Sequence, residues 1–279
     1  VECLLVAAAL QSARIRLAGD LILASVIEDE RTGNGSLACV ERGYAADGVI
    51  IVDGTWPERV VVSHLGQTSF EIELRGVAGH ATSAGPNPVR HVGDVVRTLD
   101  DLASTLNREH GRPWGSRPEP FFITIGEIGG GVWPGSVPET CTLRGQFGFP
   151  PPCTVEQARS VLASAVQAAA LRESWELAAP PVIRFTGLET PPEVGDPGNS
   201  LVTLLARTVE RHGGRLQESI ISGHCDLRHF TRATHRPTAA CLYGPGGGRN
   251  AHGVDEYFEL DHLGLVATNL ALAAWRWCQ

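Results

Sequence analysis

Hydrophobic and polar positions form two different patterns along the chain. Continuous apolar runs at 20–27 (DLILASVI) and 48–52 (GVIIV), with a helical pattern at 34–44 between them, predict two buried strands joined by a helix. A strand, a helix and a strand within about thirty residues form a βαβ unit, whose strands are parallel. A further apolar helix is expected from the first residues to about Leu17.

The middle of the chain has a different periodicity. Between residues 60 and 77 apolar and polar positions alternate, which predicts a strand with one face in water. Thr154 and Gln157 have the spacing of a capping box at the start of a helix. The other elements expected in this region are a helix at 88–108, strands at 121–128 and 140–149, a helix from 155 and a strand at 182–185. This β-α-β-β-α-β order predicts a ferredoxin-like α/β domain.

The α/β pattern of the first part of the chain, with buried apolar runs and helices, resumes near Asn199. A helix is expected from there to Arg211, then a strand at 238–243, a glycine-rich loop, and a last helix from Asp261 to the C-terminus. The inserted ferredoxin-like pattern therefore lies between two parts of one α/β domain.

These patterns predict an α/β protein with two domains. Residues 1–64 and 188–279 are expected to form a domain with a mostly parallel sheet, and residues 65–187 the inserted ferredoxin-like domain. The length of 279 residues and the 43% content of hydrophobic residues agree with two ordinary domains.

Composition excludes several classes of protein. The net charge is −8 and there is no run of Lys and Arg to neutralise phosphates, so no nucleic-acid partner is expected. No stretch reaches the roughly 20 apolar residues of a membrane span, and the N-terminus lacks the pattern of a secretory signal, so no membrane partner is expected. The seven cysteines form no C-x-x-C pair, which argues against a disulfide scaffold and favours a cytoplasmic protein.

Three adjacent acids, Glu28, Asp29 and Glu30, follow the first apolar run in the segment SVIEDERTGNGS. Their mutual repulsion requires a cation, a proton or open water. Because ligands bind beyond the carboxyl ends of parallel strands, Glu30, Asp53 and His252 are expected at one sheet edge. Carboxylates and an imidazole suit Zn²⁺ or another divalent ion, which would draw the three side chains within about 8 Å of one another.

Glu30 and Asp53 also have interpretations without a metal. Glu30 could be solvated or cap the following helix, and Asp53, before a glycine, could belong to a simple turn. The loop at 244–248 lacks the Lys and Ser/Thr of a phosphate-binding loop. Asp226 lies in the chain's His-x-Asp sequence, which by itself makes it a further candidate metal ligand.

Five segments together resemble the M20 metallopeptidases, especially the acetylornithine deacetylase and succinyl-diaminopimelate desuccinylase-like members. They are, in order, VIEDERTGNGSLACVERGYAADGVIIVDG, RGVAGHATSAGPNPV, GGGVWPGSVPET, SGHCDLRHF and YGPGGGRNAHGVDEYF. The resemblance implies a two-domain metallohydrolase with two adjacent divalent metals, usually zinc or cobalt. It also implies hydrolysis of the amide bond of N-acyl amino acids or small peptides.

The resemblance assigns roles to individual residues. Asp29 stands at the position of the general base, Glu30 and Asp53 at positions of acidic metal ligands, and His252 at that of an imidazole ligand. His80 resembles the histidine of the inserted lid domain that stabilises the oxyanion in the other subunit of a homodimer. The alternative for His80 is a histidine that caps its own loop. Asp226 falls in SGHCDLRHF, which in the family lines the substrate side or starts a helix, so the resemblance favours a helix N-cap over a metal ligand at Asp226.

Two departures from the family pattern matter. The usual base is Glu, so Asp29 is shorter by one methylene, roughly 1.5 Å of reach. The family's His-x-Asp ligands lie upstream of residue 1, so the resemblance implies an incomplete metallohydrolase domain, lacking its N-terminal part, and an inactive 279-residue chain. The alternative function is a non-catalytic relative that dimerises or binds a small ligand.

Overall fold

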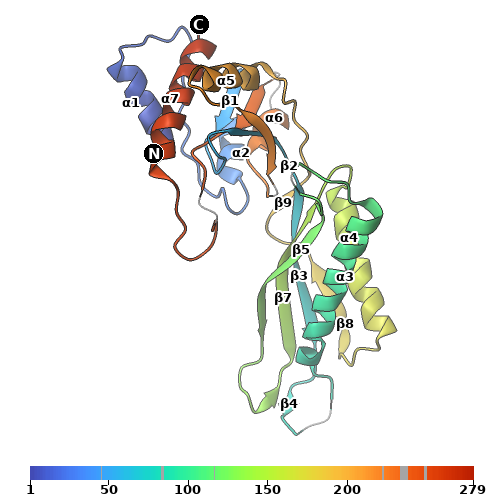
Figure 1. Ribbon diagram of the computed structural model, residues 1–279. Helices are drawn as coiled ribbons and strands as arrows, with labels where there is room; N and C mark the ends of the chain where they lie inside the picture. Colours follow the sequence, from blue (N-terminus) through green and yellow to red (C-terminus); the bar gives the residue numbers. More distant parts are fainter. Residues whose placement is uncertain (45, 83–84, 116, 222, 233–237, 248–249) are drawn as a thin grey trace. The chain divides into compact units, whose positions relative to one another are not determined.

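The computed structural model describes residues 1–44, 46–82, 85–115, 117–221, 223–232, 238–247 and 250–279 (Figure 1). The chain folds into two compact units. Unit 1 contains Val1–Ser63, Val194–Ile221 and Cys225–Gln279. Unit 2 contains His64–Glu193 and a short segment that includes His224.

Unit 1 is built around a sheet with the strand order β1-β11-β2-β10. Its strands are β1 (Gly48–Ile51), β2 (Arg59–His64), β10 (Gln217–Ile221) and β11 (Ala239–Leu242). Its helices are α1 (Glu2–Ser12), α2 (Asn34–Glu41), α5 (Ser200–Arg211), α6 (Leu227–Arg232) and α7 (Leu260–Trp277). The sheet is mixed, because β11 pairs parallel with β1 and antiparallel with β2.

Both faces of this sheet are covered by helices. In β2, Val60 and Val62 pack into one apolar core with residues of α1, α5 and α7, whereas Val61 packs into a second core with Leu227 of α6. Alternate residues of a strand point to opposite faces, so the run of three valines serves both cores. Figure 1 shows α1, α5 and α7 grouped together, in agreement with their mutual packing.

The N-terminal βαβ prediction is wrong. Residues 20–27 form no strand, and the described parallel partner of β1 is β11. The preceding helix ends at Ser12, not near Leu17. An apolar run becomes a strand only where a neighbouring strand satisfies its backbone groups, and the amino-acid pattern does not reveal that neighbour.

Unit 2 has the predicted ferredoxin-like arrangement. Its main sheet has the order β5-β7-β3-β8, with antiparallel pairing throughout, and β9 also pairs with β3. The strands are β3 (Gly66–Arg75), β5 (Phe122–Gly130), β7 (Thr140–Phe149), β8 (Ala179–Arg184) and β9 (Glu189–Thr190). The helices are α3 (Val92–His110), extended at its start by a 3-10 turn η1 (Pro88–His91), and α4 (Val155–Arg172). A short two-stranded sheet, β4 (Gly79–His80) with β6 (Ser136–Val137), completes the unit.

The alternation predicted for the lid strand is confirmed in β3. Phe70, Ile72 and Leu74 are buried in the core beneath α3 and α4, whereas Glu71 and Glu73 form ion pairs with arginines of neighbouring strands. The capping box at the start of α4 is also confirmed. The single strand expected at 60–77 is instead two strands, β2 and β3, which belong almost entirely to different units.

Asn199 fixes the start of α5. Its Oδ1 accepts hydrogen bonds from two backbone N–H groups of the first turn, at 3.1 and 3.0 Å, and its Nδ2 donates to the carbonyl of Asp196. Replacing Asn199 with alanine is expected to lower the free energy of unfolding by about 1–2 kcal/mol, because the cap is lost. Chemical denaturation measures this, with Ser200→Ala at the exposed neighbouring position as control. Equal stability of the two variants would contradict the capping role.

Among the described residues, no helix is both long enough and apolar enough to cross a lipid bilayer.

Candidate active site

The candidate site begins where β1 and β11 end. Their parallel register pairs Ile51 with Leu242, so the carboxyl ends of both strands lie at one edge of the sheet. Thr55 joins the two following segments, because its Oγ1 accepts a hydrogen bond of 2.7 Å from the N–H of Gly244. The chain carrying Asp53 therefore runs beside the start of the loop that leads to His252.

The three adjacent acids lie in a compact turn and not at the end of a strand. The carbonyl of Glu28 accepts hydrogen bonds from the backbone N–H groups of Arg31, Thr32 and Gly33, at 3.1, 3.0 and 2.9 Å. The Thr32 hydroxyl donates to the Glu28 carboxylate at 2.5 Å. Residues 28–33 are called the acidic turn below. Glu28 is thus used within the acidic turn, as a hydrogen-bond acceptor for Thr32.

Glu30 and His252 are in contact. His252 Nε2 lies 3.1 Å from Glu30 Oε2, and the two side chains are 74% and 71% exposed. His252 adopts a left-handed backbone conformation, with a φ of 61°, within its loop. The structure therefore brings together two of the residues that the sequence had selected, from segments far apart in the chain.

The carboxyl group of Asp29 has a raised pKa. Loss of hydration raises the pKa of its carboxyl group from the ordinary value to about 6. Negative charges contribute next, from Asp53, Asp226 and Glu30 in that order, and the positive charge of Arg228 opposes them. A carboxyl group with a pKa near neutrality is suited to accepting and returning a proton at physiological pH.

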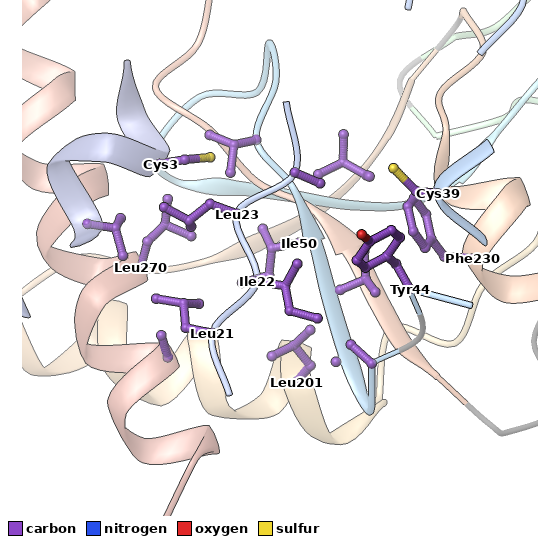
Figure 2. A pocket seen from close by; sticks show the side chains of 18 of the residues that line it. Cys3, Leu21, Ile22, Leu23, Cys39, Tyr44, Ile50, Leu201, Phe230 and Leu270 are labelled. Atoms are coloured by element: carbon purple, nitrogen blue, oxygen red, sulfur yellow. The ribbon is translucent and has the colours of Figure 1, made fainter. Parts of the chain in front are cut away.

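Asp29 is exposed on one side, and its carboxyl group also lines an apolar cavity of about 370 Å³. Figure 2 shows Ile22 and Ile50 near its middle, with Tyr44 and Phe230 toward one end and Cys3 and Leu270 toward the other. The same cavity is lined by three carboxylates of the site, those of Asp29, Asp53 and Asp226. Apolar walls hydrate a carboxylate poorly, and this disfavours its charged form.

Asp226 and Arg228 are the residues that the sequence interpretation undervalued. Asp226 is 1% exposed, and neither of its carboxylate oxygens has a hydrogen-bond partner among the described residues. The expected role as a side-chain N-cap is therefore wrong. Arg228 Nη1 lies 3.6 Å from Asp226 Oδ1, and Arg228 is 6% exposed. An acid and an arginine two positions apart in SGHCDLRHF were the available signal, but nothing in the sequence indicated that both are buried.

His80 lies in β4 of unit 2, whereas the acids lie in unit 1. Its Nδ1 is 2.8 Å from the Thr82 hydroxyl and accepts the backbone N–H of Thr82 at 3.3 Å. This loop contact is the one expected of a capping histidine. Because Nδ1 accepts this N–H, the ring hydrogen belongs on Nε2, and the residue is exposed.

The donor atoms of the site are those that a divalent metal prefers. Carboxylate oxygens from Glu30 and Asp53 and the imidazole nitrogen of His252 suit zinc or cobalt. Within the described part of the chain, no three His, Cys, Asp or Glu side chains are grouped closely enough to hold an ion as they stand. The donor chemistry thus fits a metal, and the Glu30 carboxylate and the His252 imidazole already lie in contact.

Comparison with known proteins identifies the family. The sequence matches peptidase family M20/M25/M40 over residues 2–276. The chain belongs to this family. The expectation of an M20 member, and of its α/β fold with an inserted lid domain, is therefore confirmed.

Named relatives of this M20 chain hydrolyse C–N bonds. It is 26% identical to the N-formyl-4-amino-5-aminomethyl-2-methylpyrimidine deformylase of Bacillus subtilis, over 94% of this chain and 66% of that protein. It is 24% identical to the deformylase of the same name from Halalkalibacterium halodurans, over 99% of this chain and 68% of that protein. A tripeptidase structure from Staphylococcus aureus has the same fold, with a TM-score of 0.75 and 14% identity over 97% of this chain and 67% of that one. The M20 chain thus spans about two thirds of the length of these relatives.

Proposed function

We propose that this M20 chain is part of a metal-dependent hydrolase that cleaves the amide bond of N-acyl amino acids or small peptides. The observation that supports this most directly is the contact of 3.1 Å between Glu30 and His252, beside the carboxyl group of Asp29. A carboxylate and an imidazole in contact supply metal ligands, and a neighbouring carboxyl group with a raised pKa supplies a general base.

Each residue then has a defined task. Glu30, Asp53 and His252 hold the divalent ion, zinc or cobalt. When bound, such an ion polarises the carbonyl of the scissile amide and lowers the pKa of an attacking water. Asp29 takes the proton from the water and returns it to the leaving amine. His80, through Nε2–H, donates a hydrogen bond to the oxygen that becomes negatively charged.

The names of the relatives define the substrates to test. The Bacillus subtilis relative is named for removing a formyl group from an aminomethylpyrimidine, and the Staphylococcus aureus neighbour is a tripeptidase. A formylated aminomethylpyrimidine and a tripeptide each contain an amide bond between small organic groups. A panel of N-acetylornithine, other N-acyl amino acids, a tripeptide and the formylated pyrimidine therefore samples the proposed substrate class.

Metal content and hydrolysis test the proposal together. The metal per chain is measured after dialysis, and the panel is assayed before chelation, after chelation and after Zn²⁺ or Co²⁺ is restored. Hydrolysis that disappears on chelation and returns with the metal is the expected result. The assay uses the longest natural product of the gene beside the 279 residues, because the resemblance assigns further metal ligands to a segment outside them. Hydrolysis that persists without metal, or no hydrolysis by the longer protein, would contradict the proposal.

The second candidate is a non-catalytic relative that dimerises or binds a small ligand. It is favoured by the lack of a ready group of three metal donors among the described residues. It predicts that panel compounds bind, as measured by calorimetry, without being cleaved by the metal-loaded protein.

We further propose that the protein is cytoplasmic and forms a homodimer through unit 2. In this arrangement His80 of one subunit serves the site of the other. The exposure of His80 supports that role, together with the use of its Nδ1 within its own loop, because the exposed ring then offers Nε2–H as a donor.

A further inference from the structure

Arg228 ties the acidic turn to the segment that begins α6. Its Nη2 donates to the carbonyl of Thr32 at 2.9 Å, across 196 positions of sequence. Its Nη1 donates to the carbonyl of Cys225 at 2.7 Å. The guanidinium is planar and rigid, so two hydrogen bonds to different backbone segments fix its position and orientation.

The turn also rests directly on neighbouring side chains. A Cβ atom placed on Gly33 would lie 2.2 Å from Asp226 Oδ1, 2.7 Å from Arg228 Nη2 and 2.8 Å from His229 Nε2. Gly33 in addition has a φ of 68°, in the left-handed region that favours glycine. A side chain at this position would have to displace these three groups and would also strain the backbone, so the turn packs closely against Asp226, Arg228 and His229.

The acidic turn is held together internally. Three N–H groups of the turn bond to the carbonyl of Glu28, and the Thr32 hydroxyl bonds to the Glu28 carboxylate. Such a closed loop moves as one body. Fixing the Thr32 carbonyl from outside therefore also restrains the backbone that carries Asp29 and Glu30.

Arg228 does not face solvent. It is 6% exposed, and the nearest opposite charge is the carboxylate of Asp226 at 3.6 Å. Burial lowers the pKa of Arg228, and Asp226 is the main charge that opposes this. An arginine that bound a substrate anion would need free N–H groups at a surface, whereas both Nη atoms here bond to backbone carbonyls. The contacts indicate an action on the turn, not on a substrate.

We propose that Arg228 is a positioning residue of the active site: it holds the Thr32 carbonyl, and with it the acidic turn, so that Asp29 and Glu30 stand where the proposed hydrolase needs them. This role rests on the proposed function for its effect on catalysis. The effect of the hydrogen bond from Arg228 to the Thr32 carbonyl on the acidic turn can be measured without any hydrolysis.

Two substitutions test the role. Arg228→Gln cannot span both carbonyls and removes the charge opposite Asp226. Arg228→Lys keeps the charge but not the planar fork, so it keeps the buried pair while weakening the tie. Arg207→Gln is the control, because it removes an exposed arginine from α5, in the same unit. Thermal unfolding establishes that each variant is folded, and Arg228→Lys provides the measurement if Arg228→Gln does not fold.

Hydrogen–deuterium exchange and Co²⁺ binding give two readouts that need no activity. In the Arg228 variants, amide exchange of a peptide covering residues 28–34 is expected to rise about tenfold or more, while exchange in β3 and β7 stays unchanged. Co²⁺ affinity, followed by its visible absorption, is expected to fall about 10- to 100-fold, as is typical when a group that orients a metal ligand is removed. Arg207→Gln is expected to leave both the local exchange and the Co²⁺ affinity at their original values.

Kinetics give the third readout. With the metal-loaded enzyme, kcat is expected to fall about 10- to 100-fold while KM changes less than about threefold, because the substrate contacts remain. Arg228→Lys is expected to retain more of kcat than Arg228→Gln. Folded variants with the original local exchange and Co²⁺ affinity would overturn the proposal, as would exchange that rises throughout unit 1. If the original protein cleaves nothing, the proposed function fails, and exchange and Co²⁺ binding still decide the role of Arg228.

Discussion

Replacing Asp29 with asparagine is expected to lower kcat of the metal-loaded enzyme by about 10²- to 10⁴-fold, the usual contribution of a general base. Asparagine has nearly the same shape but cannot take up a proton. KM should change little, because the ligands of the metal remain. Asp20→Asn is the matched control, since Asp20 also lines the cavity. An Asp29→Asn enzyme that retains more than about a tenth of the original kcat would rule out Asp29 as the base.

A longer side chain at the same position tests the reach of the base. Asp29→Glu restores the methylene that the family pattern contains and extends the carboxylate by roughly 1.5 Å. If the acidic turn holds the backbone where a glutamate would stand, Asp29→Glu should be at least as active as the original enzyme. A large loss of kcat would instead show that the site is shaped around aspartate.

The asparagine variant also has a stability signature in the metal-free protein. The folded pKa of Asp29 is raised to about 6, above the value of about 3.9 for an unfolded chain. The folded state therefore holds this proton more tightly, and stability from Asp29 is lost as pH rises from about 4 to about 6. Asp29→Asn should unfold at a higher temperature than the original protein above pH 6, and at nearly the same temperature below pH 4. Calorimetry in EDTA measures this, and a variant that is less stable at pH 7 would contradict the environment described for Asp29.

Replacing His80 with alanine is expected to lower kcat by about 10²- to 10³-fold, the typical cost of removing one donor to a developing oxyanion. The loop of β4 should keep its shape, because its pairing with β6 is made by the backbone. His91→Ala, at the start of α3, provides a histidine control in the same unit. An undiminished kcat would leave His80 as a loop-capping residue.

Mixing two inactive variants tests whether His80 acts across a dimer. A hybrid of one Asp29→Asn subunit and one His80→Ala subunit contains one site with both residues intact, provided that His80 serves the partner's site. If His80 served its own site, each site of the hybrid would carry one defect. Recovery of activity after subunit exchange is therefore expected, up to about a quarter of the original with random exchange. No recovery, together with a strictly monomeric mass by light scattering, would contradict the dimer.

The three adjacent acids show how far the sequence could lead. Their repulsion predicted relief by a cation, a proton or water, and the structure assigns a different form of relief to each. Glu28 accepts a hydrogen bond from Thr32, Glu30 meets the imidazole of His252, and Asp29 has a raised pKa. The sequence identified the problem, but the answer depended on partners far away in the chain.

The ferredoxin-like unit could be predicted because its signals are local. Alternating positions, a capping box and turn residues identify each strand or helix from its own residues. The β-α-β-β-α-β order of these amphipathic elements is then compatible with few topologies. The N-terminal apolar run at 20–27 gave an equally strong strand signal and failed, because a strand in a mixed sheet also needs a neighbour.

The amino-acid sequence by itself determined the α/β class, the inserted lid, and Asp29, Glu30, Asp53, His80 and His252 as candidates for the chemistry. Only the tertiary structure revealed the buried pair of Asp226 and Arg228 and the bond from Arg228 to the Thr32 carbonyl. The physical reason is that burial and charge pairing are properties of the packed chain. An arginine looks the same in a sequence whether it is solvated or holds a turn in place, and its surroundings decide which.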